Sequence, residues 1–232
     1  QGSADAALYI TVPSPLTSGG YNRIKERIET ARSQPERRPA TIIFDFNPGD
    51  KEAATQDFGT CYDLADTVAK LLDTNTIAYV HQKVSGHTVL PVLACKEIVV
   101  GPDAALGEIV SKGEPPLAGL RENGYKELIG QTQPAYLGIV RKMYDPATKL
   151  RKGRKGGADV YVDIRNDEML AKEGITVTDT RALPSAPDGV LGLFTASQLR
   201  DIGLARATVE TRGDLLEAYG LSASILREDP LG

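Results

Sequence analysis

The sequence is poor in the residues that mark metal sites and disulfide scaffolds. It contains 232 residues, of which two are cysteine, two are histidine and none is tryptophan. Cys61 and Cys95 form no Cys-x-x-Cys motif, which excludes a cysteine zinc site and a disulfide-rich scaffold. His81 and His87 show no metal-ligand spacing with a carboxylate. We therefore expect no metal and no cofactor, and two buried thiols, with one disulfide as the alternative in an oxidising compartment.

Long apolar runs and an excess of one charge are also missing. No run approaches the ~20 apolar residues that a membrane-spanning helix needs. The net charge of −4 is spread over both halves, which argues against a nucleic-acid partner. The one basic run, "KLRKGRKGG" at residues 149–157, contains three glycines and no aromatic residue. It is typical of a solvated, mobile loop, and the alternative is a patch for nucleic acid or anionic lipid.

The first part of the chain alternates between apolar, strand-like runs and helical segments. Hydrophobic residues make up 41% of the sequence, which suits a globular protein with a core. Strand-like runs occupy residues 7–13, 40–46, 75–81 and 97–102, and helical segments occupy residues 17–35, 57–72 and 86–95. This alternation predicts parallel strands joined by helical crossovers. Function is then expected at the carboxyl ends of the strands, where residues 47–50 and 83–87 should lie side by side.

Beyond residue 110 the pattern is looser. A helical segment with a break at Pro134 covers residues 124–150, and strand-like runs at residues 158–164 and 174–183 can form a hairpin. The tail predicts a short strand, a helix capped by Thr195 and ended by Gly203, and a last helix from about Gly213. We expect a single domain over residues 1–232, with a core over residues 7–110 and an extension over residues 111–232 that carries the basic loop.

Several strings along the chain carry a family likeness in their order and spacing. They are "TSGGYNRIKERIETA", "IIFDFNPGD", "TIAYV", "SGHTVLPVLACKEIVVGPDAALGE" and the tail "LFTASQLRDIGLARATVETRGDLLEAYGL". Together they resemble the Clp-protease/crotonase superfamily and, within it, the membrane-associated serine proteases of the signal-peptide-peptidase-A and NfeD type. The resemblance covers residues 7–221. It implies an α/β fold of repeated β-α-β units with a parallel sheet, helices outside, and a C-terminal helical and strand extension.

The resemblance also implies a Ser/Lys mechanism. A serine at a strand-to-helix turn attacks a peptide carbonyl, a buried neutral lysine takes its proton, and backbone amides stabilise the oxyanion. By position, Ser85 is the nucleophile and Lys142 the base. The other positions carried over are Gly49, Asp50 and Gly86 for the oxyanion hole, and His87 and Gly107 for substrate binding.

The chain departs from the family pattern at two of these positions. Counting back without gaps from the "EIVV" strand puts Gly86, not Ser85, at the nucleophile position. The second glycine of the oxyanion turn is replaced by Asp50, whose carboxylate would repel a developing oxyanion. The choice of base is open as well, with three further lysines nearby: Lys126, Lys149 and Lys152.

Each of these residues also has a structural interpretation. Ser85 is suited to be the N-cap of the helix expected from residue 86. Asp50 is a common turn residue. Lys142 in an amphipathic helix is usually a solvated surface lysine, and Thr88 is a weaker candidate nucleophile.

Three functions follow. The first is a Ser/Lys endopeptidase acting on a polypeptide, and the second is a catalytically inactive homologue that serves as an oligomeric binding or scaffold module for a membrane-protein partner. The third is an acyl-CoA hydratase or isomerase of the crotonase type. The resemblance further implies a homo-oligomer on the extracytoplasmic side, and this chain as the soluble part of a longer, membrane-tethered protein.

Overall fold

The computed structural model describes residues 7–33, 38–221 and 226–228. The chain divides into two compact units, residues 1–105 with 195–232 and residues 106–194. The last part of the chain therefore belongs to the same unit as the first. That the whole chain acts as a single domain stays a prediction.

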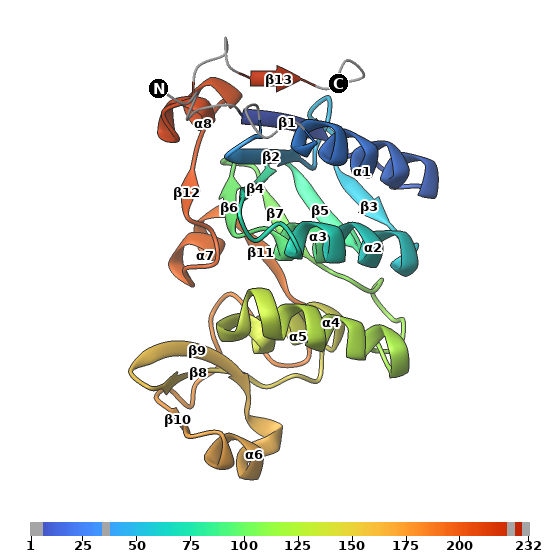
Figure 1. The fold of residues 1–232 in the computed structure, drawn as a ribbon. Helices are drawn as coiled ribbons and strands as arrows, with labels where there is room; N and C mark the ends of the chain where they lie inside the picture. Colours follow the sequence, from blue (N-terminus) through green and yellow to red (C-terminus); the bar gives the residue numbers. More distant parts are fainter. Residues whose placement is uncertain (1–6, 34–37, 222–225, 229–232) are drawn as a thin grey trace. The chain divides into compact units, whose positions relative to one another are not determined.

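Six strands of the first unit form one sheet, shown in Figure 1. They lie in the order β12-β6-β4-β2-β1-β13, and neighbouring strands in this sheet are parallel. Their bounds are β1 (Ala7–Thr11), β2 (Thr41–Asp45), β4 (Asn75–Val80), β6 (Glu97–Val100), β12 (Ala207–Thr208) and β13 (Leu226–Glu228). The predicted α/β fold with a parallel sheet is confirmed.

The central strands are buried on both faces because helices cover the sheet. The crossover helices are α1 (Ser18–Arg32), α2 (Phe58–Ala69) and α3 (Val89–Ala94), and they lie side by side in Figure 1. Successive residues of a strand point to opposite faces, and Ile42 and Ile43 of β2 are both fully buried. Ile43 packs in one cluster with Leu215 of α8 (Arg212–Ala218).

The predicted tail and cysteines are also confirmed. Thr195 caps α7 (Ala196–Asp201) with a capping box, and Gly203 follows that helix with a φ of 78°. Cys61 and Cys95 are buried free thiols, and burial raises the pKa of Cys61 to about 12. Among the described residues, no helix is both long and apolar enough to cross a membrane.

Two short strands that lie outside the six-stranded sheet, in a separate sheet, were not predicted. They are β3 (Ala53–Thr55) and β5 (Lys83–Gly86), which pair in parallel. The helix predicted from residue 86 starts only at Val89, so the interpretation of Ser85 as its N-cap is wrong. The physical reason is that the backbone up to residue 87 pairs with β3 instead of entering the helix, since the N–H of His87 donates to the Thr55 carbonyl at 2.8 Å.

The second unit contains a helical layer and a small antiparallel sheet. Its elements are α4 (Gly119–Thr132), a 3-10 turn η2 (Pro134–Tyr136), α5 (Leu137–Tyr144), β8 (Leu150–Lys155), β9 (Ala158–Asp163), η3 (Ile164–Asn166), α6 (Asp167–Lys172) and β10 (Ile175–Val177). The strands β7 (Ala105–Gly107) and β11 (Leu193–Thr195) lie where the chain passes between the units. The break predicted at Pro134 is confirmed.

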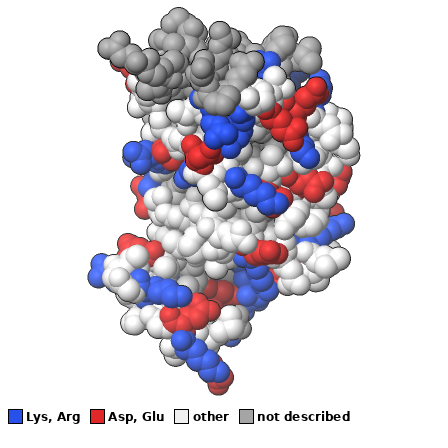
Figure 2. All heavy atoms as spheres, in the orientation of Figure 1, with Lys and Arg blue, Asp and Glu red and all other residues white. Residues whose placement is uncertain are grey.

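Two predictions for this unit are wrong. The basic run at residues 149–157 is not a loop: it forms the whole of β8 and the turn into β9. The hairpin joins β8 to β9, and β10 pairs with the other edge of β8. Cross-strand ion pairs explain why a charged run becomes a strand, since Lys152 and Arg154 both reach Asp159 on β9. Acidic and basic side chains are interspersed over the face in Figure 2.

Candidate functional site

The carboxyl ends of β2 and β4 are tied together by one buried side chain, Asn47. Its side-chain oxygen accepts hydrogen bonds from the backbone N–H groups of His81 (3.0 Å) and Gln82 (3.1 Å). Its amide nitrogen donates to the carbonyls of Lys51 (2.8 Å) and Lys83 (3.3 Å). Residues 47–50 and the start of β5 therefore lie side by side, as predicted.

The expected oxyanion turn has its amide already engaged. Gly49 and Asp50 both adopt the left-handed backbone conformation, with φ values of 67° and 55°. The N–H of Asp50 donates to the carbonyl of Asn47 at 3.0 Å, which closes the turn. The Asp50 carboxylate does not point back at that amide: its Oδ1 lies 3.1 Å from Nδ1 of His81.

His81 joins this turn to the end of β2. Its other ring nitrogen, Nε2, lies 3.0 Å from Oδ1 of Asp45, the last residue of β2. Asp45 also accepts hydrogen bonds from the hydroxyl of Tyr9 (3.0 Å) and the N–H of Asn47 (2.9 Å). Burial and the adjacent Asp45 carboxylate both raise the pKa of Tyr9, so its hydroxyl is a permanent donor. Sequence reasoning missed this cluster, although polar residues at the ends of adjacent buried strands were its signal.

The position that the ungapped count predicts for the nucleophile, Gly86, carries no side chain. Gly86 has a φ of 61°, and a Cβ at this position would lie 2.7 Å from the backbone oxygen of Thr55. Ser85 is half-buried within β5, opposite Ala54 of β3. His87, expected beside the substrate, is 3% exposed and its ring packs edge-on against Phe58 at 5.3 Å.

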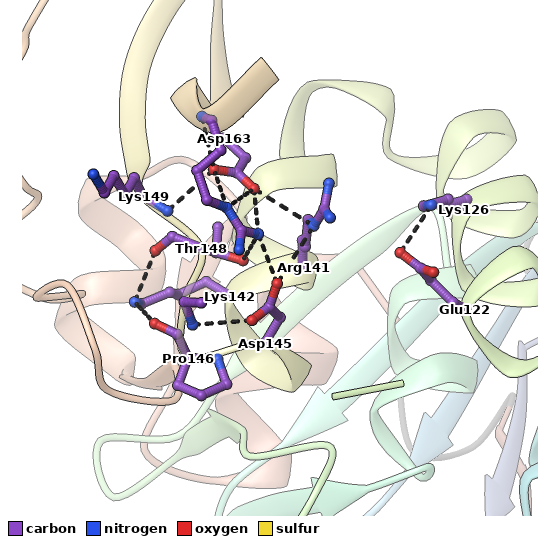
Figure 3. A network of polar contacts seen from close by, with 11 residues as sticks. Glu122, Lys126, Arg141, Lys142, Asp145, Pro146, Thr148, Lys149 and Asp163 are labelled. Atoms are coloured by element: carbon purple, nitrogen blue, oxygen red, sulfur yellow. Dashed lines mark hydrogen bonds and ion pairs between the residues drawn. The ribbon is translucent and has the colours of Figure 1, made fainter. Parts of the chain in front are cut away.

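Lys142 has no exposed surface, so its interpretation as a solvated lysine is wrong. Figure 3 shows its ammonium pointing into the loop after α5, where it donates to the carbonyls of Pro146 (3.0 Å) and Thr148 (2.9 Å). Burial lowers the pKa of Lys142, and the nearby Asp188 and Asp145 carboxylates only partly offset this. Its burial follows from helical spacing, because Ile139, three residues earlier on the same helix, is also fully buried.

A set of ion pairs holds the loop that accepts these hydrogen bonds (Figure 3). Arg165 donates to Asp145 (2.6 Å) and to Asp163 (2.6 Å). Asp145 in turn accepts from the N–H of Ala147 (2.9 Å), and Asp163 from that of Lys149 (3.1 Å). The carbonyls around Lys142 are thus fixed in position by charged groups on either side.

The alternative bases and the predicted substrate-binding glycine have other roles. Lys126 and Lys152 are surface lysines paired with Glu122 (2.8 Å) and Asp159 (2.6 Å). Gly107 has a φ of 147°, and a Cβ there would lie 2.2 Å from the carbonyl oxygen of Gly192. It allows two backbone segments of the second unit to approach closely.

The second unit also contains an apolar cavity of about 530 Å³, a size typical of ligand-binding pockets. Aromatic side chains contribute to it, among them Tyr161, which stacks on Tyr136 with the ring centroids 6.0 Å apart. Met169 of α6 lies on its wall and is 57% exposed. The cavity is lined from α4, α5, the hairpin and α6, by residues that include Tyr125, Leu137, Val140, Tyr144, Val160 and Leu170.

No model of a protein family matches the sequence, and no curated protein matches it. Solved structures do match. A serine-to-alanine mutant of 1510-N, a membrane-bound stomatin-specific protease, is 10% identical over 98% of both chains, with a TM-score of 0.54. The chain has the Clp-protease/crotonase fold. A lysine-to-alanine mutant of 1510-N with a substrate peptide gives a TM-score of 0.53 at 10% identity, over 93% of this chain and 80% of that one. The 1510-N protease comes from Pyrococcus horikoshii.

The Clp-protease/crotonase fold does not by itself select a reaction. A methylmalonyl-CoA decarboxylase complexed with 2S-carboxypropyl CoA gives the same TM-score of 0.53, at 12% identity over 96% of this chain and 69% of that one. Because a protease and an acyl-CoA enzyme fit equally well, the function has to be argued from the residues.

Proposed function

We propose that this chain is a polypeptide-binding module on the Clp-protease/crotonase fold that does not hydrolyse peptide bonds. The observation that carries the proposal is Gly86, which lacks a side chain and lies in contact with the β3 backbone where the family pattern expects a serine. A serine hydrolase needs a hydroxyl at this point, beside a base and an oxyanion hole.

Two further features support the loss of hydrolysis. The Asp50 amide, expected in the oxyanion hole, already donates to Asn47. The Lys142 ammonium donates to the carbonyls of Pro146 and Thr148 and so acts as a structural donor to this loop. The residues expected to supply the nucleophile, the oxyanion hole and the base therefore each have a structural role instead.

A polypeptide is the proposed ligand for two reasons. The apolar cavity of the second unit can take apolar side chains, and the exposed Met169 on its wall is an adaptable contact for them. The 1510-N protease, whose fold this chain shares, has been solved with a substrate peptide. We further infer a membrane-tethered, extracytoplasmic homo-oligomer with a membrane-protein partner, to be tested by membrane fractionation and by light scattering.

The test has a chemical arm and a binding arm. A fluorophosphonate probe should leave the wild-type protein unlabelled, and a label that Ser85→Ala removes would overturn the proposal.

In the binding arm, fluorescence anisotropy with a labelled apolar, unfolded polypeptide should show binding that Met169→Glu weakens at least about tenfold, because a charge would enter an apolar pocket. Leu120→Glu is the matched control, since Leu120 is 87% exposed on α4 and does not line the cavity.

A Ser/Lys endopeptidase is the second candidate, favoured by the burial and lowered pKa of Lys142. These are the properties that a general base of this kind needs. Cleavage of an extended polypeptide that is lost in both Ser85→Ala and Lys142→Met would select this function. Retention of the protein on a CoA resin would instead favour the acyl-CoA reaction.

A further inference from the structure

The His81 ring is held between two carboxylates at the carboxyl edge of the sheet. Nε2 lies 3.0 Å from Asp45 and Nδ1 lies 3.1 Å from Asp50. A carboxylate only accepts hydrogen bonds, and a neutral imidazole donates from one nitrogen alone. Both contacts are satisfied together only when His81 is a protonated imidazolium.

The groups around the ring act in the same direction. Burial alone would lower the pKa of His81, but the hydrogen bonds and charges of Asp45 and Asp50 outweigh burial and raise it. Tyr79 of β4 stacks on the ring with centroids 4.6 Å apart. The facing elements contribute Tyr9 from β1 and, from α8, Arg212, which lies over the Tyr9 ring, and Asp214, which acts on Tyr79.

We propose that His81 is a protonation-controlled latch on the turn at residues 47–50, closing it when charged and releasing Asp50 when neutral. The latch acts at the strand-end turn of the first unit, and its role in binding rests on the proposed polypeptide-binding function. The change of state is the loss of one proton from the imidazolium to solvent, which leaves one N–H donor for two carboxylates.

Asp50 is the carboxylate that leaves. Asp45 is buried and is bound by Tyr9 and by the Asn47 amide, so losing a donor there would leave a buried charge less satisfied. The Asp50 side chain is 84% exposed, and water can replace its one partner. The remaining N–H of His81 therefore stays with Asp45.

Release of Asp50 loosens the turn because its backbone is in an unfavourable region. A residue with a Cβ at φ 55° is costly unless other contacts hold it, and the contacts seen here are the ion pair with His81 and the hydrogen bond from the Asp50 N–H to the Asn47 carbonyl. When the turn relaxes, the Asp50 N–H leaves the Asn47 carbonyl and becomes available to a carbonyl of a bound polypeptide. The site is thus expected to open as the pH rises through the pKa of His81.

The test measures hydrogen exchange of the Asp50 amide by NMR from pH 5 to pH 9, corrected for the intrinsic exchange rate, together with the titration of the His81 ring. We expect protection to fall about tenfold in step with His81 deprotonation, which corresponds to about 1.4 kcal/mol. Asp50→Gly is the decisive variant, since glycine accepts φ 55° without a carboxylate. The amide at position 50 should then exchange without any step at the His81 pKa, and that pKa should fall.

Two controls separate the latch from other effects. Asp63→Asn removes an exposed carboxylate from α2 and should leave both the step and the His81 pKa unchanged. Constant protection of the Asp50 amide across the His81 titration would overturn the latch. Because the exchange measurement uses no peptide, the latch can fail while polypeptide binding holds, or hold while binding fails. If both hold, affinity for the labelled polypeptide should be higher at pH 9 than at pH 5. Equal affinities at the two pH values would show that the latch does not control binding.

Discussion

His81 in the first unit and Lys142 in the second are both largely buried cations, yet their surroundings shift the pKa in opposite directions. His81 lies between two carboxylates, which raise its pKa in spite of burial. Lys142 lies between two backbone carbonyls, and burial lowers its pKa. A carbonyl dipole satisfies the hydrogen bonds of a cation without supplying the full charge that offsets its lost hydration. His81 is therefore a buried cation held by charge, and Lys142 is one held mainly by hydrogen bonds to carbonyls.

The largest loss of stability is expected when the charge of the Asp45 carboxylate beside His81 is removed. Asp45→Asn should lower the free energy of unfolding by about 3 kcal/mol at pH 5, because it leaves a buried imidazolium with one exposed carboxylate. Urea unfolding monitored by circular dichroism measures this loss. Asp63→Asn, on the exposed side of α2, should change the same quantity by less than about 0.5 kcal/mol. Equal losses in the two variants would show that the buried pair carries no particular stability.

A smaller loss is expected on the Lys142 side. Lys142→Met keeps the apolar stem but removes the ammonium donor from the Thr148 carbonyl and leaves the Pro146 carbonyl with the N–H of Gly189 alone. This should cost about 2 kcal/mol at pH 7. Lys126→Met is the matched control, since it removes a half-exposed lysine with one surface ion pair. If Lys142→Met unfolds at the wild-type urea concentration, the ammonium is not needed to satisfy this loop.

The smallest effects, and the sharpest contrast, are the two pH dependences. The pKa of His81 is raised above the unfolded value of about 6.5, so its stabilisation is full below that pH and is lost as the pH rises through the folded pKa. The pKa of Lys142 is lowered from 10.5, so between the folded pKa and 10.5 the unfolded chain binds more protons and stability rises with pH.

Each slope should disappear in its own variant. His81→Gln should abolish the fall in the free energy of unfolding above pH 6.5, and Lys142→Met should abolish its rise toward pH 10.5. Each of these changes amounts to about 1.4 kcal/mol for each unit by which the folded and unfolded pKa values differ. Urea unfolding of the wild type and both variants from pH 5 to pH 10 measures both slopes. If the two residues gave pH slopes of the same sign, this would contradict the view that carboxylate charges hold His81 and carbonyl dipoles hold Lys142.

The sheet could be predicted from sequence because its signals are long and local. The apolar runs of β2 and β4 and the helical spacing of α1 and α2 each fix an element without knowledge of the rest. The strands β3 and β5 could not be predicted, since three or four residues carry no period, and Gly86 in β5 is typical of a turn.

The candidate site could be predicted only in part. Residues 47–50 and 83–87 were placed together by the rule for parallel strand ends, and this was correct. The pairing of His81 with Asp45, which is 36 residues away, depends on the register of β2 against β4, where Asp45 lies opposite Tyr79. The burial of Lys142 was visible in its helical spacing with Ile139, but its two acceptors come from a loop whose course is set by Arg165.

The pairing of β3 with β5 limits which side chains position 86 can accept. Writing a serine at position 86 is a single substitution, yet its side chain would collide with the backbone of Thr55, at φ 61° where only glycine is comfortable. The β3 segment would have to be rebuilt first. A side chain at position 86 therefore requires a backbone change in β3, which a single substitution at that position does not make.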